Sequence, residues 1–185
     1  LPKLMNDYYK FFNRIIDVEL SDTNETVSIR NGSSGGLIIE AYRLQSDGSQ
    51  GERVYKRVID SQLTREVRVY LHAGEDKFTM NVGHSRVKIR LIGGSGAKKY
   101  DFGNAGPRVL LYENKALSAP ALIGTFRGRQ IVSSDSLNTA YVAKDMYSRK
   151  LIFPYLAYNN DDGIALGFAL KFINPGFRKS PYGNS

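Results

Sequence analysis

The chain has 185 residues, of which 42% are hydrophobic and 24% charged, a balance that indicates a folded protein and excludes disorder as its main state. It contains no cysteine, which excludes disulfide bonds, thiol nucleophiles and cysteine metal sites. The formal net charge is +8, but Lys and Arg are scattered and mostly alternate with apolar residues. That pattern is typical of a solvated sheet face, so we expect no nucleic-acid partner.

Apolar residues at the start of the chain recur at helical spacing. They are Leu4, Met5, Tyr8, Phe11, Phe12, Ile15 and Ile16. The spacing predicts an amphipathic helix over residues 1–17, with Pro2 in its first turn, that packs on the sheet that follows. A membrane-surface helix is the alternative, but the segment carries few cations. No signal peptide is visible, and no helical run reaches the roughly 18 apolar residues of a transmembrane helix.

Short strands are expected next, beginning at Val27–Arg30. The glycine-rich loop 31–36 joins this strand to a strand over 37–44, and a third strand follows over 53–59. A phosphate-binding loop would need a lysine at Walker spacing and a following helix, and neither is present. We therefore interpret this loop as a hairpin connection.

A motif of about 20 residues then occurs two and a half times, in copies near residues 65–80, 85–102 and 108–113. Each copy begins with alternating apolar and polar residues, and the first two continue through a glycine-containing turn into a second strand. The shared phase predicts one buried face, which contains Val67, Val69, Leu71, Val87, Ile89 and Leu91. Two interpretations stay open: stacked coils of a β-solenoid, or a sandwich of successive antiparallel hairpins.

The polar residues of this β-rich region, residues 18–117, give no catalytic constellation. Gly74-Glu75-Asp76 and the turn at residues 93–96 are similar to calcium-binding glycine–aspartate turns, but Lys98 and Lys99 follow where carboxylates would be needed. His72 and His84 have no partner at ligand spacing. We expect no catalytic residue, metal site or cofactor. A glycan- or protein-binding surface built from exposed tyrosines is the alternative, with the candidates Tyr55, Tyr70 and Tyr100.

Residues 118–150 are interpreted as a connection, and the pattern becomes clear again over 151–185. A strand with Pro154 precedes the turn Asn159-Asn160-Asp161-Asp162-Gly163, and a ten-residue strand follows over 164–173. A transmembrane β-strand needs about 9–11 residues, apolar toward lipid and small or polar toward the lumen. The predicted lipid-facing residues are Ile164, Leu166, Phe168, Leu170 and Phe172.

This tail, together with Pro175-Gly176-Phe177-Arg178-Lys179-Ser180-Pro181-Tyr182-Gly183, resembles the first barrel strands of the bacterial surface antigen family of outer-membrane proteins. The resemblance is greatest to Bacteroidetes proteins in which a calcineurin-like metallophosphoesterase is fused to such a barrel. Residues 55–57, 64–70, 74–78 and 92–96 resemble the β-rich segment between enzyme and barrel in those proteins. The resemblance implies an outer-membrane location and supplies no catalytic residue.

We therefore expect a mainly β fold with an N-terminal helix, followed by the truncated start of an outer-membrane β-barrel. The expected role is that of a non-catalytic linker in the periplasm or at the surface, which contacts outer-membrane lipid through its C-terminal strands and could meet an outer-membrane protein partner. A second alternative is that the chain belongs to a metallophosphoesterase whose catalytic domain lies upstream, so enzymatic activity of the full-length protein stays an open question.

Overall fold

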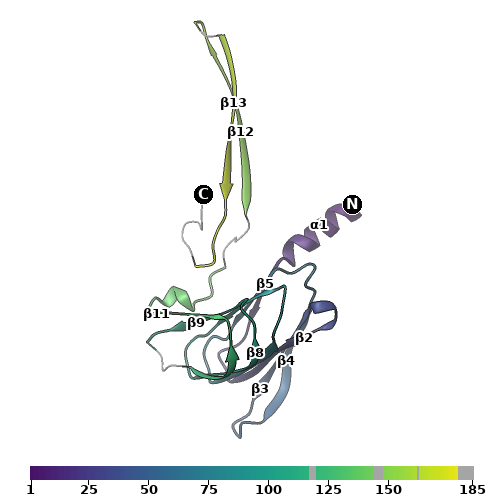
Figure 1. The fold of residues 1–185 in the computed structure, drawn as a ribbon, viewed down its shortest axis with the longest axis vertical. Helices are drawn as coiled ribbons and strands as arrows, with labels where there is room; N and C mark the ends of the chain where they lie inside the picture. Colours follow the sequence, from purple (N-terminus) through teal and green to yellow (C-terminus); the bar gives the residue numbers. More distant parts are fainter. Residues whose placement is uncertain (117–119, 144–147, 162, 179–185) are drawn as a thin grey trace. The chain divides into compact units, whose positions relative to one another are not determined.

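The computed structural model describes residues 1–116, 120–143, 148–161 and 163–178. It shows a mainly β protein with one α-helix and three sheets. The chain divides into two compact units, Leu1–Tyr141 and Val142–Ser185. The first contains the helix and two sheets, and the second contains a two-stranded hairpin (Figure 1).

The N-terminal helix is shorter than the spacing predicts. Helix α1 spans Pro2–Phe12 and ends at Asn13, while Ile15–Glu19 forms strand β1. Ile16 is buried in the core as a strand residue, so its place in the apparent helical stripe is coincidental. None of the helix residues is buried, and the predicted packing of this helix on the sheet is therefore wrong.

One sheet has five strands in the order β1-β5-β7-β9-β11, and every neighbouring pair is parallel. After β1, its strands are β5 (Glu66–Tyr70), β7 (Lys88–Ile92), β9 (Val109–Asn114) and β11 (Arg129–Ser133).

The other sheet has six strands in the order β10-β8-β6-β2-β3-β4. Its strands are β2 (Glu25–Asn31), β3 (Leu37–Leu44), β4 (Gln50–Ile59), β6 (Asp76–Val82), β8 (Lys98–Ala105) and β10 (Ala121–Phe126). Strands β10, β8, β6 and β2 are parallel, whereas β2-β3-β4 is an antiparallel meander. A short 3-10 helix, Ser33–Gly35, lies in the predicted hairpin connection between β2 and β3.

The repeated motif forms successive turns of chain between these two sheets (Figure 1). Glu66 on β5 pairs with Lys88 on β7, and Asp76 on β6 pairs with Lys98 on β8, each an offset of 22 residues. The alternative of successive antiparallel hairpins is therefore wrong. The 20-residue offset is also wrong by two residues, but a two-residue slip leaves every side chain on the same face of its strand.

The apolar core lies between the sheets and contains all six residues that the phase predicts to be buried. They are Val67, Val69, Leu71, Val87, Ile89 and Leu91, each no more than 1% exposed. From the six-stranded sheet they meet Val27, Ile29, Phe78, Met80, Tyr100 and Phe102.

Glycines set the 22-residue register at one corner of the fold. Gly74 and Gly96 both have positive φ, at 97° and 90°, a conformation that glycine adopts without a Cβ penalty. A Cβ at Gly96 would clash with the carbonyl oxygen of Gly74, and a Cβ at Gly94 would clash with that of His72. The turns therefore stack glycine over the preceding backbone, which fixes the alignment of the strands that follow.

Two strands lie within the stretch that was interpreted as a connection. Strand β10 pairs with β8 and strand β11 pairs with β9, so the third copy continues to Ser133. The sequence pattern of β10 is weak because its six residues are exposed except for half-buried Phe126. The ring of Phe126 stacks on that of Phe102, with 4.6 Å between centroids. The interpretation of residues 118–150 as a connection is wrong over 121–133.

After β11 the chain returns over the outward face of the five-stranded sheet. The 3-10 helix Ser136–Asn138 carries the Asn138 amide, which donates to the carbonyl oxygens of Glu113 at 2.7 Å and Ile131 at 3.2 Å. The ring of Tyr141 meets that of Tyr70 edge-on, with 5.0 Å between centroids. We refer to residues 134–141 as the return segment.

Candidate functional site

The second unit is an antiparallel hairpin of β12 (Arg149–Asn159) and β13 (Gly163–Ile173), as the turn chemistry predicts. Eleven residue pairs join the strands without a register shift, from Arg149 with Ile173 to Asn159 with Gly163. Pro154 lies opposite Phe168 within β12. A hairpin of this length presents two continuous faces, because paired residues of an antiparallel ladder project to the same side.

One face of the hairpin is apolar over nearly its whole length. On β13 it carries the five predicted lipid-facing residues, and on β12 their partners Ile152, Pro154, Leu156 and Tyr158, with Lys150 at the open end. Leu166 is 79% exposed and Phe172, the least exposed of the five predicted residues, is 49% exposed. The alternation is as the sequence predicts, but nothing within the hairpin removes this face from water.

The opposite face of β13 carries small residues, Ala165, Gly167 and Ala169, before Lys171. Tyr155 lies directly opposite Gly167, and a Cβ at Gly167 would clash with the Tyr155 ring. The glycine therefore makes room for an aromatic ring that covers the neighbouring backbone, an arrangement that pins strand register in curved sheets.

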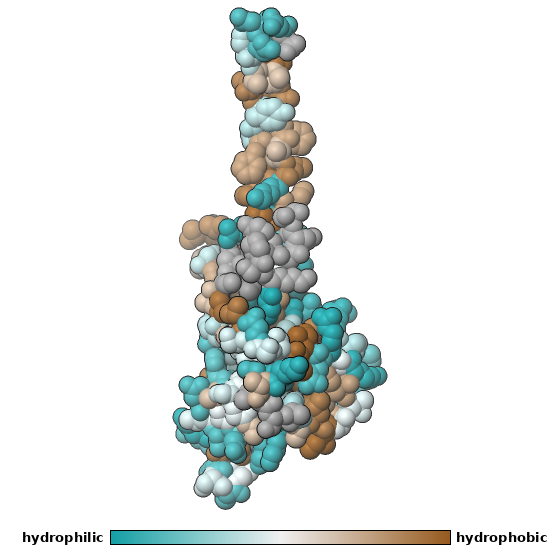
Figure 2. Space-filling model, turned by 90° about the vertical axis from the view of Figure 1, so that its left-hand side faces the viewer, coloured by the Kyte–Doolittle hydropathy of each residue, from teal (hydrophilic) through white to brown (hydrophobic). Residues whose placement is uncertain are grey.

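Polar residues bound the apolar part of the hairpin at both ends. Asn159, Asn160 and Asp161 form the turn, and Arg149, Lys150 and Lys171 lie near the open end. Figure 2 shows the same order along the hairpin, with hydrophobic residues between hydrophilic ones. The apolar stretch from Leu151 to Tyr158 spans roughly 26 Å at about 3.3 Å per residue.

The predicted tyrosine surface does not form. Tyr70 is 2% exposed, Tyr100 is 0% exposed, and Tyr55 is half-buried against the core. Tyr100 shares its strand face with Phe102, so its parity on β8 places it inward. The hypothesis that these three tyrosines form an exposed aromatic surface is therefore wrong for Tyr70 and Tyr100.

A buried ion pair lies at the turn that resembles a glycine–aspartate calcium turn, between Asp76 and Lys98. The Lys98 ammonium lies 2.6 Å from Asp76 Oδ2 and donates to the Gly74 carbonyl oxygen at 2.8 Å. Asp76 Oδ1 accepts the backbone N–H of Glu25 at 2.9 Å, so both carboxylate oxygens are bonded. Lys98, whose position in the sequence argues against a calcium site, therefore occupies the place of a cation beside Asp76.

Burial perturbs the titration of this cluster. Desolvation raises the pKa of Asp76 to about 6, although the neighbouring Lys98 ammonium favours the ionised form. Burial also raises the pKa of Glu113, and it raises the pKa of Tyr100 far above its ordinary value. The Tyr100 hydroxyl donates to the Glu113 carboxylate, so the two groups satisfy each other inside the protein. Perturbed groups also occur in structural networks, and Asp76 lines a recess of only about 40 Å³.

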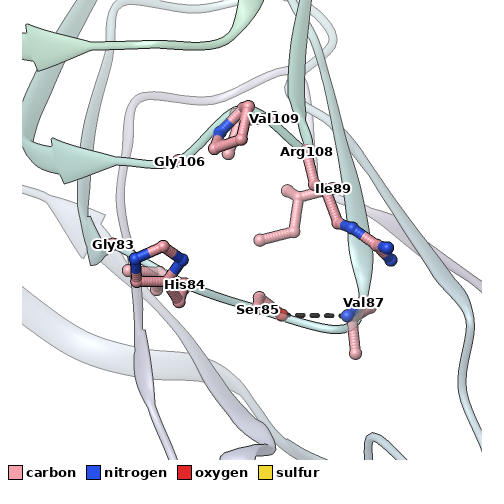
Figure 3. Close-up of a pocket in the computed structure, with 10 residues that line it drawn as sticks. Gly83, His84, Ser85, Val87, Ile89, Gly106, Arg108 and Val109 are labelled. Atoms are coloured by element: carbon pink, nitrogen blue, oxygen red, sulfur yellow. Dashed lines mark hydrogen bonds between the residues drawn. The ribbon is translucent and has the colours of Figure 1, made fainter.

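A small recess lies between two successive turns of the stack and has a volume of about 80 Å³. Figure 3 shows His84 and Ser85 on one side, and Arg108 and Val109 from the next turn on the other. Ser85 Oγ accepts the backbone N–H of Val87 at 3.0 Å, which closes the turn. Pockets for organic ligands have volumes of about 300–1,000 Å³, so this recess is too small for one.

The two histidines remain apart from any ligand cluster. His72 Nε2 lies 3.7 Å from a Glu19 carboxylate oxygen, and His84 is exposed at the recess. Within the described ranges, no group of three His, Cys, Asp or Glu side chains lies close enough to hold a metal ion. No helix in the described part of the chain is both long and apolar enough to cross a membrane.

The hairpin is therefore the candidate functional site, because it exposes an apolar face that no described residue of its unit covers. No family model, curated protein or solved structure matches this chain.

Proposed function

We propose that this chain joins a short two-sheet β-solenoid, residues 15–133, to the opening hairpin of an outer-membrane β-barrel, and that its role is to connect and orient rather than to catalyse. The observation that carries the proposal is the β12–β13 hairpin, with its apolar face and polar ends. The solenoid part rests on parallel pairing at a 22-residue offset, which is the arrangement of stacked coils.

The dimensions of the hairpin match those of a membrane strand pair. Each strand has 11 residues, and about 9–11 are needed to cross a bilayer at a typical tilt. At a tilt of about 35–45°, the stretch from Leu151 to Tyr158 would rise roughly 18–21 Å, a little less than the apolar band of an outer-membrane barrel, which is about 25 Å tall.

Two strands cannot act alone in a membrane. Their outer edges carry unpaired backbone groups, which in lipid require closure into a barrel. Bacterial single-chain barrels use at least 8 strands, so the proposal requires further strands from sequence beyond these residues or from other copies. The apolar face formed by β12 and β13 would then contact lipid, and the face with Ala165, Gly167 and Ala169 would line the interior.

The likeness of the tail to the surface-antigen barrels agrees with this proposal and would place the β-solenoid in the periplasm or at the cell surface. An upstream phosphoesterase domain stays a prediction from that likeness alone. The glycan- or protein-binding alternative built on exposed tyrosines is not favoured, since Tyr70 and Tyr100 are buried.

Single-cysteine scanning tests the proposal directly, because these 185 residues contain no native cysteine, and any cysteine elsewhere in the full-length protein is first replaced by serine. Each residue from 164 to 173 is replaced in the full-length protein, and membranes are labelled with a probe confined to the lipid phase. Labelling should alternate, strong at Ile164, Leu166, Phe168 and Leu170 and weak at Ala165, Gly167 and Ala169. Val58→Cys, exposed on the solenoid, should react only with a water-soluble reagent.

Labelling without alternation, or recovery of the full-length protein in the soluble fraction, would contradict the barrel assignment. A third result, alternation that appears only when several copies associate, would replace the single-chain barrel by an oligomeric one. Sedimentation of the detergent-extracted protein separates these two cases.

A further inference from the structure

The outward face of the six-stranded sheet carries an excess of positive charge. We define the cationic face as Arg30, Arg53, Lys56, Lys77 and Lys99. All five share the outward side, because the alternate residues of their strands, such as Ile29, Phe78 and Tyr100, point into the core.

The carboxylates on this face do not balance its cations. Glu40 and Asp101 are the two acidic residues among the outward positions of its strands, against five cations, which leaves a net charge of +3. Glu40 is itself shared by three of them, at 3.2 Å from Arg30, 3.8 Å from Arg53 and 3.2 Å from Lys56. The Lys56 hydrogen bond and the other cations hold the pKa of Glu40 below its usual range.

The five-stranded sheet treats its outward charges differently. Arg68 is 5% exposed and lies 2.7 Å from Glu66 and 3.7 Å from Asp17. Arg90 donates to the same Glu66 carboxylate at 2.9 Å and to the Tyr112 hydroxyl. Arg68 and Arg90 are matched and largely buried, whereas the side chains of Arg30, Arg53 and Lys56 are 44–52% exposed. Lys88 and Arg129 are the exposed cations on the outward side of the five-stranded sheet.

On β2 and β6, the outward positions beside the cations carry uncharged polar side chains. These are Thr26 and Ser28 on β2, and Thr79 and Asn81 on β6. Their hydroxyl and amide groups can donate and accept hydrogen bonds with sugar hydroxyls. Ile38, Tyr42 and Val58 share the outward side at the β3–β4 end of the sheet. Lipid favours apolar residues among cations and nucleic-acid bases stack on aromatic rings, so both are competing partners that the test includes.

We propose that the cationic face binds a polyanionic glycan, a polysaccharide that carries carboxylate, sulfate or phosphate groups. Neighbouring strands lie about 4.8 Å apart and same-face residues along a strand about 6.6 Å apart. The face therefore offers a flat lattice of charges and hydrogen-bonding groups to an extended polyanion. Each exposed contact is weak and screened by salt, so affinity comes from many contacts together.

The test uses the 185-residue chain and a defined-length sulfated heparin oligosaccharide, with polygalacturonate as the carboxylate probe and dextran as the uncharged control. Lys77→Glu/Lys99→Glu should weaken binding by roughly tenfold at low salt, since it reverses two cations paired in register. Glu40→Gln should tighten binding by about twofold, because it removes the carboxylate that Arg30, Arg53 and Lys56 share.

Arg86→Glu/Lys88→Glu is the matched control, because it makes the same change in net charge at exposed positions outside the six-stranded sheet. It should weaken binding far less than the Lys77/Lys99 pair. Equal losses in both double variants would show that only net charge matters and would overturn the proposal. Stronger binding to phosphatidylglycerol vesicles or to a single-stranded oligonucleotide than to either charged glycan would also overturn it. Unchanged melting temperatures in all variants confirm that folding is not the cause.

Discussion

The two-sheet unit and the hairpin use the same alternation of side chains with opposite results. On β5, Val67 and Val69 are 0% exposed, while on β13 Ile164 and Leu166 are 71% and 79% exposed. Strands β5 and β7 face a second sheet, whereas among the described residues of the second unit the hairpin faces none. Alternation of apolar and polar residues thus shows which face of a strand avoids water. It does not show whether another sheet, lipid or a partner covers that face.

The residues on the opposite face of each strand distinguish the two-sheet unit from the hairpin more clearly. Outward positions of the two-sheet unit carry long charged side chains, such as Lys77 and Lys99. The second face of β13 carries Ala165, Gly167 and Ala169 instead. Long charged side chains suit open water, whereas small ones suit a curved, crowded interior.

The largest expected effect on stability comes from placing a carboxylate in the core of the two-sheet unit, in contrast to the same change on the hairpin. Val69→Asp should unfold the two-sheet unit, because an unpaired buried carboxylate costs several kcal/mol and the stability of a domain is only about 5–15 kcal/mol. Leu166→Asp should leave the melting temperature of the two-sheet unit unchanged. Thermal unfolding followed by circular dichroism checks both, and equal melting curves for Val69→Asp and the parent would contradict the buried assignment.

A second contrast removes one partner of the buried pair. Lys98→Met leaves Asp76 without its cation and should cost about 3–5 kcal/mol in free energy of unfolding. The double variant Asp76→Asn/Lys98→Met should recover much of that loss, since neither buried charge remains. Urea titration measures both variants, and a double variant as unstable as the single one would show that packing of the lysine stem dominates.

If the hairpin belongs to an outer-membrane barrel as proposed, a charge on its apolar face should matter when the protein assembles in the membrane. Within the full-length protein, Phe168→Arg should hinder assembly at a cost of about 2–4 kcal/mol, if its position is near the bilayer midplane. Ala169→Arg, on the opposite face, should cost less. The yield of protease-protected protein in the outer-membrane fraction gives the comparison, and equal yields would mean that the two faces do not differ in lipid contact.

The buried Asp76 should make the stability of the two-sheet unit depend on pH. The pKa of Asp76 rises from 3.8 in the unfolded chain to about 6 in the folded one, so the folded state holds the proton longer. The stability that Asp76 contributes is full below about pH 4 and is lost as pH rises through 6, by about 1–3 kcal/mol. Subtracting the pH profile of Asp76→Asn from that of the parent isolates this term, which a flat difference between pH 4 and 7 would refute.

The smallest expected effect is that of calcium. The Lys98 ammonium already lies between Asp76 Oδ2 and the Gly74 carbonyl oxygen, so a divalent cation would meet a like charge there. Millimolar calcium should leave the melting temperature unchanged. A rise with calcium but not with magnesium would mean that the ion displaces the lysine.

The sequence predicts the inward phase of β5 and β7 and the hairpin with its five apolar positions, because period-2 patterns are local. It does not predict the register, which depends on Gly96 passing over Gly74. Strands β10 and β11 escape prediction because they end the stack and bury few side chains. The two-residue error in register is harmless to face assignment, since it is an even number.

The candidate site is predictable only in part. Inward orientation of Tyr100 follows from its phase with Phe102, but its bond to Glu113 joins residues on different strands and needs the fold. The cationic face likewise gathers Arg30, Lys56 and Lys99 from distant segments that share no local pattern.

The return segment has a mechanical consequence for a protein tethered at its C-terminal side. Asn138 bonds to backbone carbonyls of both β9 and β11, and Tyr141 lies against Tyr70 on β5. Tension that enters at Val142 therefore reaches β5 and β9 before it can peel β11 from its neighbour. The two Asn138 hydrogen bonds and the Tyr141–Tyr70 ring contact must therefore break before such tension can act on the pairing of β11 with β9.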